Sequence, residues 1–170
     1  DGLSLDDLAD VTGRLLACGA DIVEINTIRK RLSAVKGGRF AQAAHPAHVF
    51  SVVLSDVLGD RLDSIASGPA CPDSFTSGDA ARIVAKYGLE LAPRVTDALR
   101  VETPKSLDNA TAVITGSVTA LCAAAEESAR SLGYETLVLT TSLDCEAREA
   151  GAFLAALARE VRASGRPLAS

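Results

Sequence analysis

Apolar residues recur at helical spacing through the first 36 residues and predict two helices. The first series, within residues 4–18, consists of Leu5, Leu8, Val11, Leu15 and Leu16. The second series, within residues 22–36, consists of Ile22, Ile25, Ile28, Leu32 and Val35. Gly19 follows the first series and Gly37-Gly38 follows the second, as expected where helices end. The short connection predicts an N-terminal helical hairpin over residues 1–45.

From residue 46 onward, short apolar runs alternate with helical patterns. Residues 49–54 form a β-branched apolar run typical of a buried strand, whereas residues 59–78 predict a loop with a short extended piece at 64–66. Further strands are predicted at 111–115 and 135–140, and helices at 77–87, 93–100, 117–132 and 146–162. This order predicts βα units over residues 46–170. We therefore expect a single α/β domain, doubly wound, with a mostly parallel Rossmann-like sheet.

Composition and charge narrow the function classes. With 170 residues, 48% of them hydrophobic and 23% charged, the chain fits one soluble globular domain. The net charge of −5 argues against a nucleic-acid binder, and no apolar run reaches the ~18–20 residues that a membrane span needs. The four cysteines lie far apart in sequence, which favours a reducing cytoplasm over a zinc site.

Polar residues follow each of the three predicted strands, where ligands bind in open α/β sheets. Ser55-Asp56 follows the first strand, Gly116-Ser117 the second, and Thr141-Ser142 with Asp144 the third. The Asp56 carboxylate could accept a proton from a substrate hydroxyl or hold magnesium through water, and the nearby Asp60 and Asp63 favour a cation. The alternative for Asp56 is a turn residue bonded to its own backbone. Gly116-Ser117 could contact a phosphate, or Ser117 could be a plain helix N-cap.

Two basic residues flank the diglycine at the end of the second predicted helix. Lys36 and Arg39 could clamp a carboxylate or phosphate, or could complement the negative end of the helix. Ser67-Gly68 could bring the backbone close to the same anion. Arg29, Lys30 and Arg31 are expected mainly on a solvated face, although one could turn toward the site.

Familiar catalytic and nucleotide-binding motifs are missing. The sequence contains no G-x-G-x-x-G and no G-x-x-x-x-G-K-[ST]. His45 and His48 are the only histidines, and their spacing leaves both a dyad and a surface-loop role open.

Taken together, the motifs resemble the glycerate 2-kinase family, the MOFRL-type group historically labelled hydroxypyruvate reductase. The resemblance covers essentially the whole chain. It rests on residues 26–33 with Lys36-Gly37-Gly38-Arg39, Ser55-Asp56-Val57 with Gly59-Asp60, residues 65–69 with Pro72-Asp73, Gly116-Ser117, and Glu146-Ala147-Arg148-Glu149. Two positions depart from the family pattern: Val118 replaces the usual Asn, and Cys145 replaces a common Gly.

The resemblance implies transfer of the ATP γ-phosphoryl group to the 2-hydroxyl of D-glycerate, with magnesium, in the cytoplasm. It also implies that this chain, which begins at Asp1, is the later part of the kinase's N-terminal domain. The active site would lie in a cleft to a second domain, so we expect the chain alone to be inactive. The implied roles are catalysis by Asp56 and Lys36, substrate binding by Arg39, Ser55, Ser67 and Gly68, and contact with ATP by Gly37, Gly38, Gly116 and Ser117. No residue is assigned as a metal ligand.

Two other functions stay open at this point. An NAD(P)-dependent hydroxypyruvate reductase would need a dinucleotide fingerprint, which the sequence does not contain. A non-catalytic, ligand-binding α/β fragment needs no such motif. The sequence also leaves a homodimer open.

Overall fold

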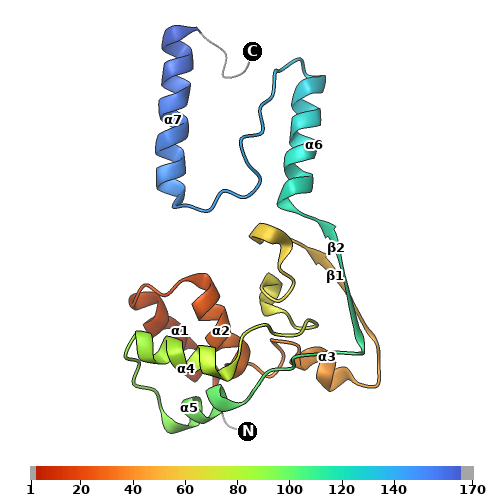
Figure 1. Cartoon of the computed structure of the whole chain (residues 1–170), viewed down its shortest axis with the longest axis vertical. Helices are drawn as coiled ribbons and strands as arrows, with labels where there is room; N and C mark the ends of the chain where they lie inside the picture. The colour runs from red at the N-terminus through yellow and green to blue at the C-terminus, as the bar shows by residue number, and fades with distance from the viewer. Residues whose placement is uncertain (1–2, 166–170) are drawn as a thin grey trace. The chain divides into compact units, whose positions relative to one another are not determined.

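The computed structural model describes residues 3–165, which form two compact units (Figure 1). The first unit comprises the chain up to Val53 together with Arg61–Thr115. The second comprises Leu54–Asp60 and the chain from Gly116 onward. In residues 3–165, no helix is both long and apolar enough to cross a membrane.

The first unit is built on four helices. They are α1 (Leu5–Ala17), α2 (Ile22–Leu32), α4 (Ser77–Lys86) and α5 (Pro93–Arg100). Capping boxes start three of them, at Ser4 with Asp7, Asp21 with Glu24, and Thr76 with Asp79. In each box a side-chain oxygen accepts from a backbone N–H that the helix leaves unpaired. The predicted helical hairpin is therefore confirmed as α1 and α2.

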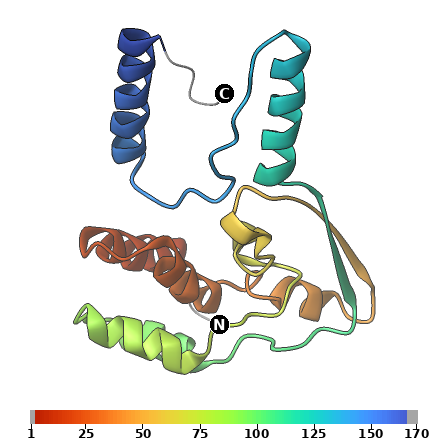
Figure 2. The same cartoon turned by 45° about the horizontal axis from the view of Figure 1, so that its top comes forward.

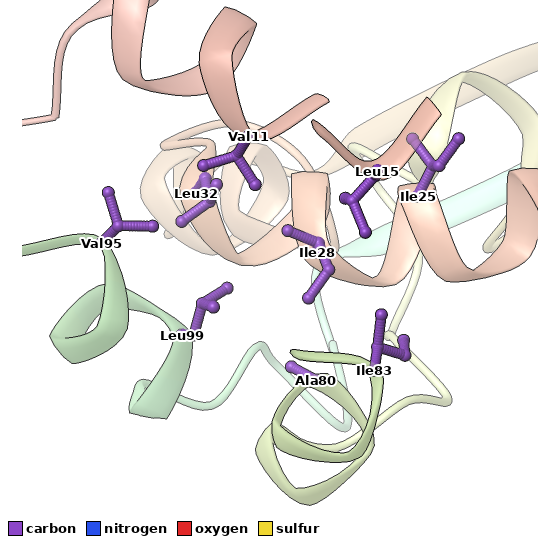
Figure 3. Close-up of a cluster of buried hydrophobic side chains, with 9 residues drawn as sticks. All are labelled: Val11, Leu15, Ile25, Ile28, Leu32, Ala80, Ile83, Val95 and Leu99. Atoms are coloured by element: carbon purple, nitrogen blue, oxygen red, sulfur yellow. The ribbon is translucent and has the colours of Figure 1, made fainter. Parts of the chain in front are cut away.

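The four helices enclose a small aliphatic core (Figure 3). Its members are Val11, Leu15, Ile25, Ile28, Leu32, Ala80, Ile83, Val95 and Leu99. Leu5 and Leu16, which the helical spacing placed in the same stripe as Val11, are 84% and 62% exposed. The buried stripe of α1 is thus narrower than the sequence pattern indicated.

Helix α2 ends at Leu32, although the apolar spacing predicted helix as far as Lys36. Ser33 is extended, with φ −101° and ψ 138°. The Arg39 guanidinium donates to the carbonyl oxygens of Arg31 and Ser33, both at 2.7 Å, so it satisfies acceptors that the helix end leaves free. Val35 is exposed instead of continuing the apolar stripe.

Two predicted strands are confirmed as a parallel pair, β1 (Val49–Leu54) and β2 (Ala110–Gly116). The backbone N–H of Val49 donates to Asn109 at one end and that of Ser55 to Gly116 at the other, so both strands run in the same direction. The strands lie side by side in both views (Figure 1 and Figure 2). A short helix that the sequence did not predict, α3 (Arg39–Ala44), precedes β1.

The predicted extended piece at residues 64–66 is wrong. Residues Ile65–Ser67 form a short 3₁₀ turn, η2, and Leu58–Asp60 form another, η1. Both turns contain positive φ angles, which a strand does not tolerate.

The second unit contains α6 (Val118–Ser131) and α7 (Ala147–Ser164), both as predicted within a few residues. The strand predicted at residues 135–140 is absent: this segment has no regular structure, and Leu137 and Leu139 are exposed. A strand needs a neighbour that pairs with its backbone, and none lies beside this segment within residues 3–165. The α/β class with parallel strands is therefore confirmed, whereas the described sheet has two strands and not three.

Candidate functional site

Two glycine-containing loops, about 30 residues apart in sequence, pair through their backbones in the first unit. The N–H of Gly37 donates to the carbonyl of Ser67 at 2.9 Å, and the N–H of Gly38 donates to that of Gly68 at 2.7 Å. The structure thus brings together two motifs that the sequence identified separately. These two bonds occupy the N–H groups of Gly37 and Gly38, which were expected to contact ATP. The two glycines therefore shape the loop and do not offer free hydrogen-bond donors.

The turn opposite the diglycine has unusual backbone geometry. Ala66, Ser67 and Gly68 have φ angles of 51°, 61° and 57°, three left-handed residues in succession. For the two non-glycine residues this conformation costs about 1–3 kcal/mol each, and such strain gathers at functional sites. The Lys36 ammonium donates to Ala66 O at 3.1 Å, and the Ser67 hydroxyl donates to Asn26 Oδ1 at 3.2 Å. These bonds hold the strained turn against the end of α2.

Close backbone packing explains why glycine stands at two of these positions. A Cβ on Gly38 would lie 2.9 Å from the carbonyl oxygen of Cys71, and one on Gly68 would lie 3.1 Å from the backbone of Asp63. Both residues are also left-handed. Gly38 therefore permits a close approach to the segment at Cys71, and Gly68 closes a tight turn back onto Asp63.

Lys36 and Arg29 form a pair of like charges beside this turn. Burial lowers the pKa of the Lys36 ammonium, and the positive charge of Arg29 lowers it further. Neither side chain forms an ion pair with a carboxylate anywhere in the described part of the chain. Among the described residues, neither cation of this pair is therefore neutralised by a paired carboxylate.

A buried ion cluster lies behind the two loops. Lys30 Nζ is 2.9 Å from Asp73 Oδ1, Arg31 Nη1 is 3.4 Å from Asp73 Oδ2, and Thr103 donates its hydroxyl to Asp73 Oδ2 at 2.8 Å. All four side chains are at most 2% exposed. The expectation that Lys30 and Arg31 face solvent is therefore wrong. A signal was available, because Arg31 is three residues after Ile28 and so shares the buried face of α2.

The carboxylates of this cluster stay ionised. Burial alone would raise the pKa of Asp73, but the hydrogen bonds from Lys30 and Thr103 outweigh it and leave the pKa below its ordinary value. In Asp63, burial is likewise outweighed by the hydrogen bond from Ser74 and the charge of Lys30, so its pKa is also lowered. The cluster is a charged scaffold that fixes α2 against residues 63–73.

Arg39 interacts with the negative end of α2, which is the alternative to an anion clamp that the sequence left open. Its Nη1 donates to three carbonyls at the end of α2, those of Lys30, Arg31 and Ser33. The same side chain lines a cavity of about 930 Å³ formed by α1, the end of α2 and α5. The cavity walls are mainly aliphatic, and none of the other candidate residues contributes to them. In this geometry Arg39 caps the C-terminal end of α2, and its binding of an anion stays a prediction.

The second unit carries the residues at the strand ends. The N–H of Ser55 donates to Gly116 O at 2.8 Å, which holds Ser55-Asp56 next to Gly116-Ser117. Ser55 is buried and its hydroxyl bonds Val57 O at 3.3 Å. The Ser117 hydroxyl accepts from the N–H of Ala120, so Ser117 is the N-cap of α6. The Asp56 side chain is exposed, with no hydrogen bond or ion pair to the described residues. Its carboxylate is thus available to a ligand beside a helix N-terminus.

The described residues do not gather a metal site. Among residues 3–165, no three Asp, Glu, His or Cys side chains lie close enough together to hold an ion. Of the three acids expected to favour a cation, Asp63 is instead bound by Ser74, Lys30 and Arg61. His48 bonds the Thr111 hydroxyl at 3.0 Å, at the surface of the strand pair.

Comparison with known proteins decides the family. Residues 1–100, which carry both paired loops and Asp56, match the family described as Domain of unknown function (DUF4147). The chain belongs to the DUF4147 family. Among its relatives is a D-glycerate 2-kinase from Thermotoga maritima, 52% identical over 99% of this chain and 40% of that protein. A glycerate kinase from Rattus norvegicus is 40% identical over 92% of the chain and 31% of its own length.

Solved structures agree with this DUF4147 assignment. A glycerate kinase from Thermotoga maritima superposes with a TM-score of 0.81, covering 99% of this chain and 41% of its own. A protein from Pyrococcus horikoshii OT3, 37% identical, superposes with a TM-score of 0.71 over 98% of this chain and 40% of its own. The resemblance to glycerate kinases is confirmed, and the chain spans about 40% of the length of these two relatives.

Proposed function

We propose that this chain is part of an ATP-dependent D-glycerate 2-kinase, which converts D-glycerate to 2-phosphoglycerate. The observation that carries the proposal is the 52% identity to a D-glycerate 2-kinase across 99% of the chain. The local geometry supports it, because phosphoryl transfer relies on positioning and on charge neutralisation more than on covalent chemistry. We place the activity in the cytoplasm.

Asp56 is the proposed general base. The carboxylate is exposed at the end of β1 beside the N-terminus of α6, where a carboxylate can reach a bound ligand. In this role it accepts the proton of the glycerate 2-hydroxyl as that oxygen becomes bonded to phosphorus. Ser55 holds the turn through its bonds to Gly116 and Val57.

Lys36 is the proposed neutralising cation. Its ammonium is held by Ala66 O, which leaves two of its three N–H donors for a substrate oxygen. Ser67 and Gly68 belong to the turn that holds Lys36, and the N–H groups of Gly37 and Gly38 bond their carbonyls.

ATP is the proposed phosphoryl donor, and magnesium would supply further charge neutralisation when bound. The described residues form no group that fits a metal ion, so we assign magnesium to none of them. Gly116 and Ser117, at the N-terminus of α6, are the proposed backbone contact for a phosphate.

An assay of the complete gene product tests the proposal. We expect ADP to form from ATP only when D-glycerate is present. The opposite result, oxidation of NADH by hydroxypyruvate with no ATP-dependent reaction, would replace the kinase with the reductase.

A further inference from the structure

Arg29 and Lys36 differ from most other cations of this chain. The neighbouring Lys30 and Arg31 turn inward, and both pair with Asp73. Within residues 3–165, three more basic residues lack an ion pair: Arg39 is used by carbonyls, and Arg159 and Arg162 lie exposed on α7. Among the described residues, Arg29 and Lys36 are therefore a partly buried pair of like charges without an ion-pair partner, close enough for Arg29 to lower the pKa of Lys36.

Hydrogen bonds connect the surroundings of this pair to the turn at residues 66–68. Asn26 and Arg29 share a face of α2, because they are three residues apart on the helix. Lys36 donates to Ala66 O, and Asn26, one helical turn before Arg29, accepts from the Ser67 hydroxyl. The left-handed turn at residues 66–68 therefore holds Lys36 and the face of α2 that carries Arg29. Two neighbouring cations repel each other, and an anion bound between them would relieve that repulsion.

We propose that Arg29 and Lys36 together bind one oxyanion of the reactants, with Asn26 and the turn at residues 66–68 as its frame. This inference rests on the proposed kinase function and adds Arg29 as a binding residue. A guanidinium offers paired N–H donors that match a carboxylate or a phosphoryl group, and the ammonium adds a point charge. The shared chemistry is a compact oxyanion, either the carboxylate of glycerate or a phosphate of the nucleotide.

Calorimetric titration of the complete gene product separates these two sources. D-glycerate alone and inorganic phosphate alone are titrated into the wild type, Arg29→Gln, Arg29→Lys and the control Arg159→Gln. Arg159 is exposed on α7 and has no ion pair among residues 3–165, so it matches the change of charge without touching the site. We expect Arg29→Gln to weaken one of the two ligands at least tenfold, Arg29→Lys to weaken it less, and Arg159→Gln to leave both unchanged. The ligand that is weakened is the one held by the pair.

A second measurement does not depend on binding. NMR titration of the Lys36 ammonium should show a higher pKa in Arg29→Gln than in the wild type, because a like charge has been removed. Unchanged affinity of Arg29→Gln for both ligands, or failure of the wild type to bind either, would overturn the inference. If Arg29→Gln binds both ligands with unchanged affinity but the protein is an active kinase, the anion site is excluded and the proposed function is retained. Arg29-dependent binding without kinase activity would remove the function and keep the anion site.

Discussion

Lys30 Nζ lies 2.9 Å from Asp73 Oδ1 inside the first unit, with both side chains removed from solvent. Asp73 also forms an ion pair with Arg31 and accepts a hydrogen bond from Thr103. One carboxylate thus binds two buried cations and the segment that follows α5. A Cβ on Gly37 would lie 3.1 Å from the Thr103 side chain and 3.3 Å from that of Lys30, so the loop at residues 37–38 packs directly on this cluster. The position of the candidate site therefore depends on it.

Replacing Asp73 with Ala should strongly destabilise the first unit. The change leaves Lys30 and Arg31 buried without a counter-charge, which costs about 3–5 kcal/mol in comparable cases. Urea unfolding followed by circular dichroism measures the loss. The matched control is Asp97→Ala, which removes an exposed pair with Arg100 and should cost less than about 0.5 kcal/mol. Equal losses for the two variants would show that the cluster is not the anchor we describe.

Stability should fall on acidification. Asp63 and Asp73 have lowered pKa values in the folded chain, and hydrogen bonds from Ser77 and Lys105 outweigh burial in Glu102 and lower its pKa from 4.5 to about 2. A lowered folded pKa gives stability that is complete above the unfolded value and is lost as pH falls toward the folded one. Urea midpoints should therefore decline between pH 4.5 and 2 and hold steady above that window. A midpoint that rises in acid would contradict the assigned ion pairs.

Gly38→Ala should lower the free energy of unfolding more than Gly19→Ala does, because it adds a steric clash to the cost of the left-handed backbone. Gly38 is left-handed and an added Cβ would lie 2.9 Å from Cys71 O, whereas Gly19 is equally left-handed with no atom within 4 Å. Gly19→Ala should cost about 1 kcal/mol through its backbone alone, and Gly38→Ala clearly more. The difference in unfolding free energy between the two variants is the measurement. No difference would mean that Gly38 does not approach the backbone at Cys71 as closely as described.

Asp56→Asn should reduce turnover in the complete gene product while leaving the affinity for glycerate nearly unchanged. Loss of a general base typically lowers the rate by about 10²–10⁴-fold. The control Asp108→Asn removes a similarly exposed carboxylate just before β2, at the opposite end of the strand pair from Asp56, and should keep full activity. Full turnover in Asp56→Asn would exclude it as the base.

Local patterns were enough to predict most elements of the fold. The capping residues Ser4 and Asp21 mark the first two helices, and the β-branched run before Ser55 marks β1. The strand at residues 135–140 failed because strand propensity requires a neighbour that the described chain does not provide. The early end of α2 depends on Arg39, six residues beyond Ser33, and so is invisible to helical periodicity.

The candidate site was predictable in its residues but not in its arrangement. The sequence identified Lys36, Gly38 and Gly68 separately, whereas the pairing of their loops is a long-range contact. It also predicted Arg29, Lys30 and Arg31 mainly on a solvated face, with one of them able to turn toward the site. Successive residues of a helix point in different directions, so the three side chains have different surroundings. Arg31 lies on the buried face of α2, whereas Arg29 lies beside Lys36.

Phosphorus NMR of the reaction products tests the kinase proposal most directly. The complete gene product is incubated with D-glycerate, ATP and magnesium, and the phosphorylated product is identified by its position of substitution. The account predicts that 2-phosphoglycerate and ADP accumulate in equal amounts. Formation of 3-phosphoglycerate, or no phosphorylated glycerate at all, would contradict it.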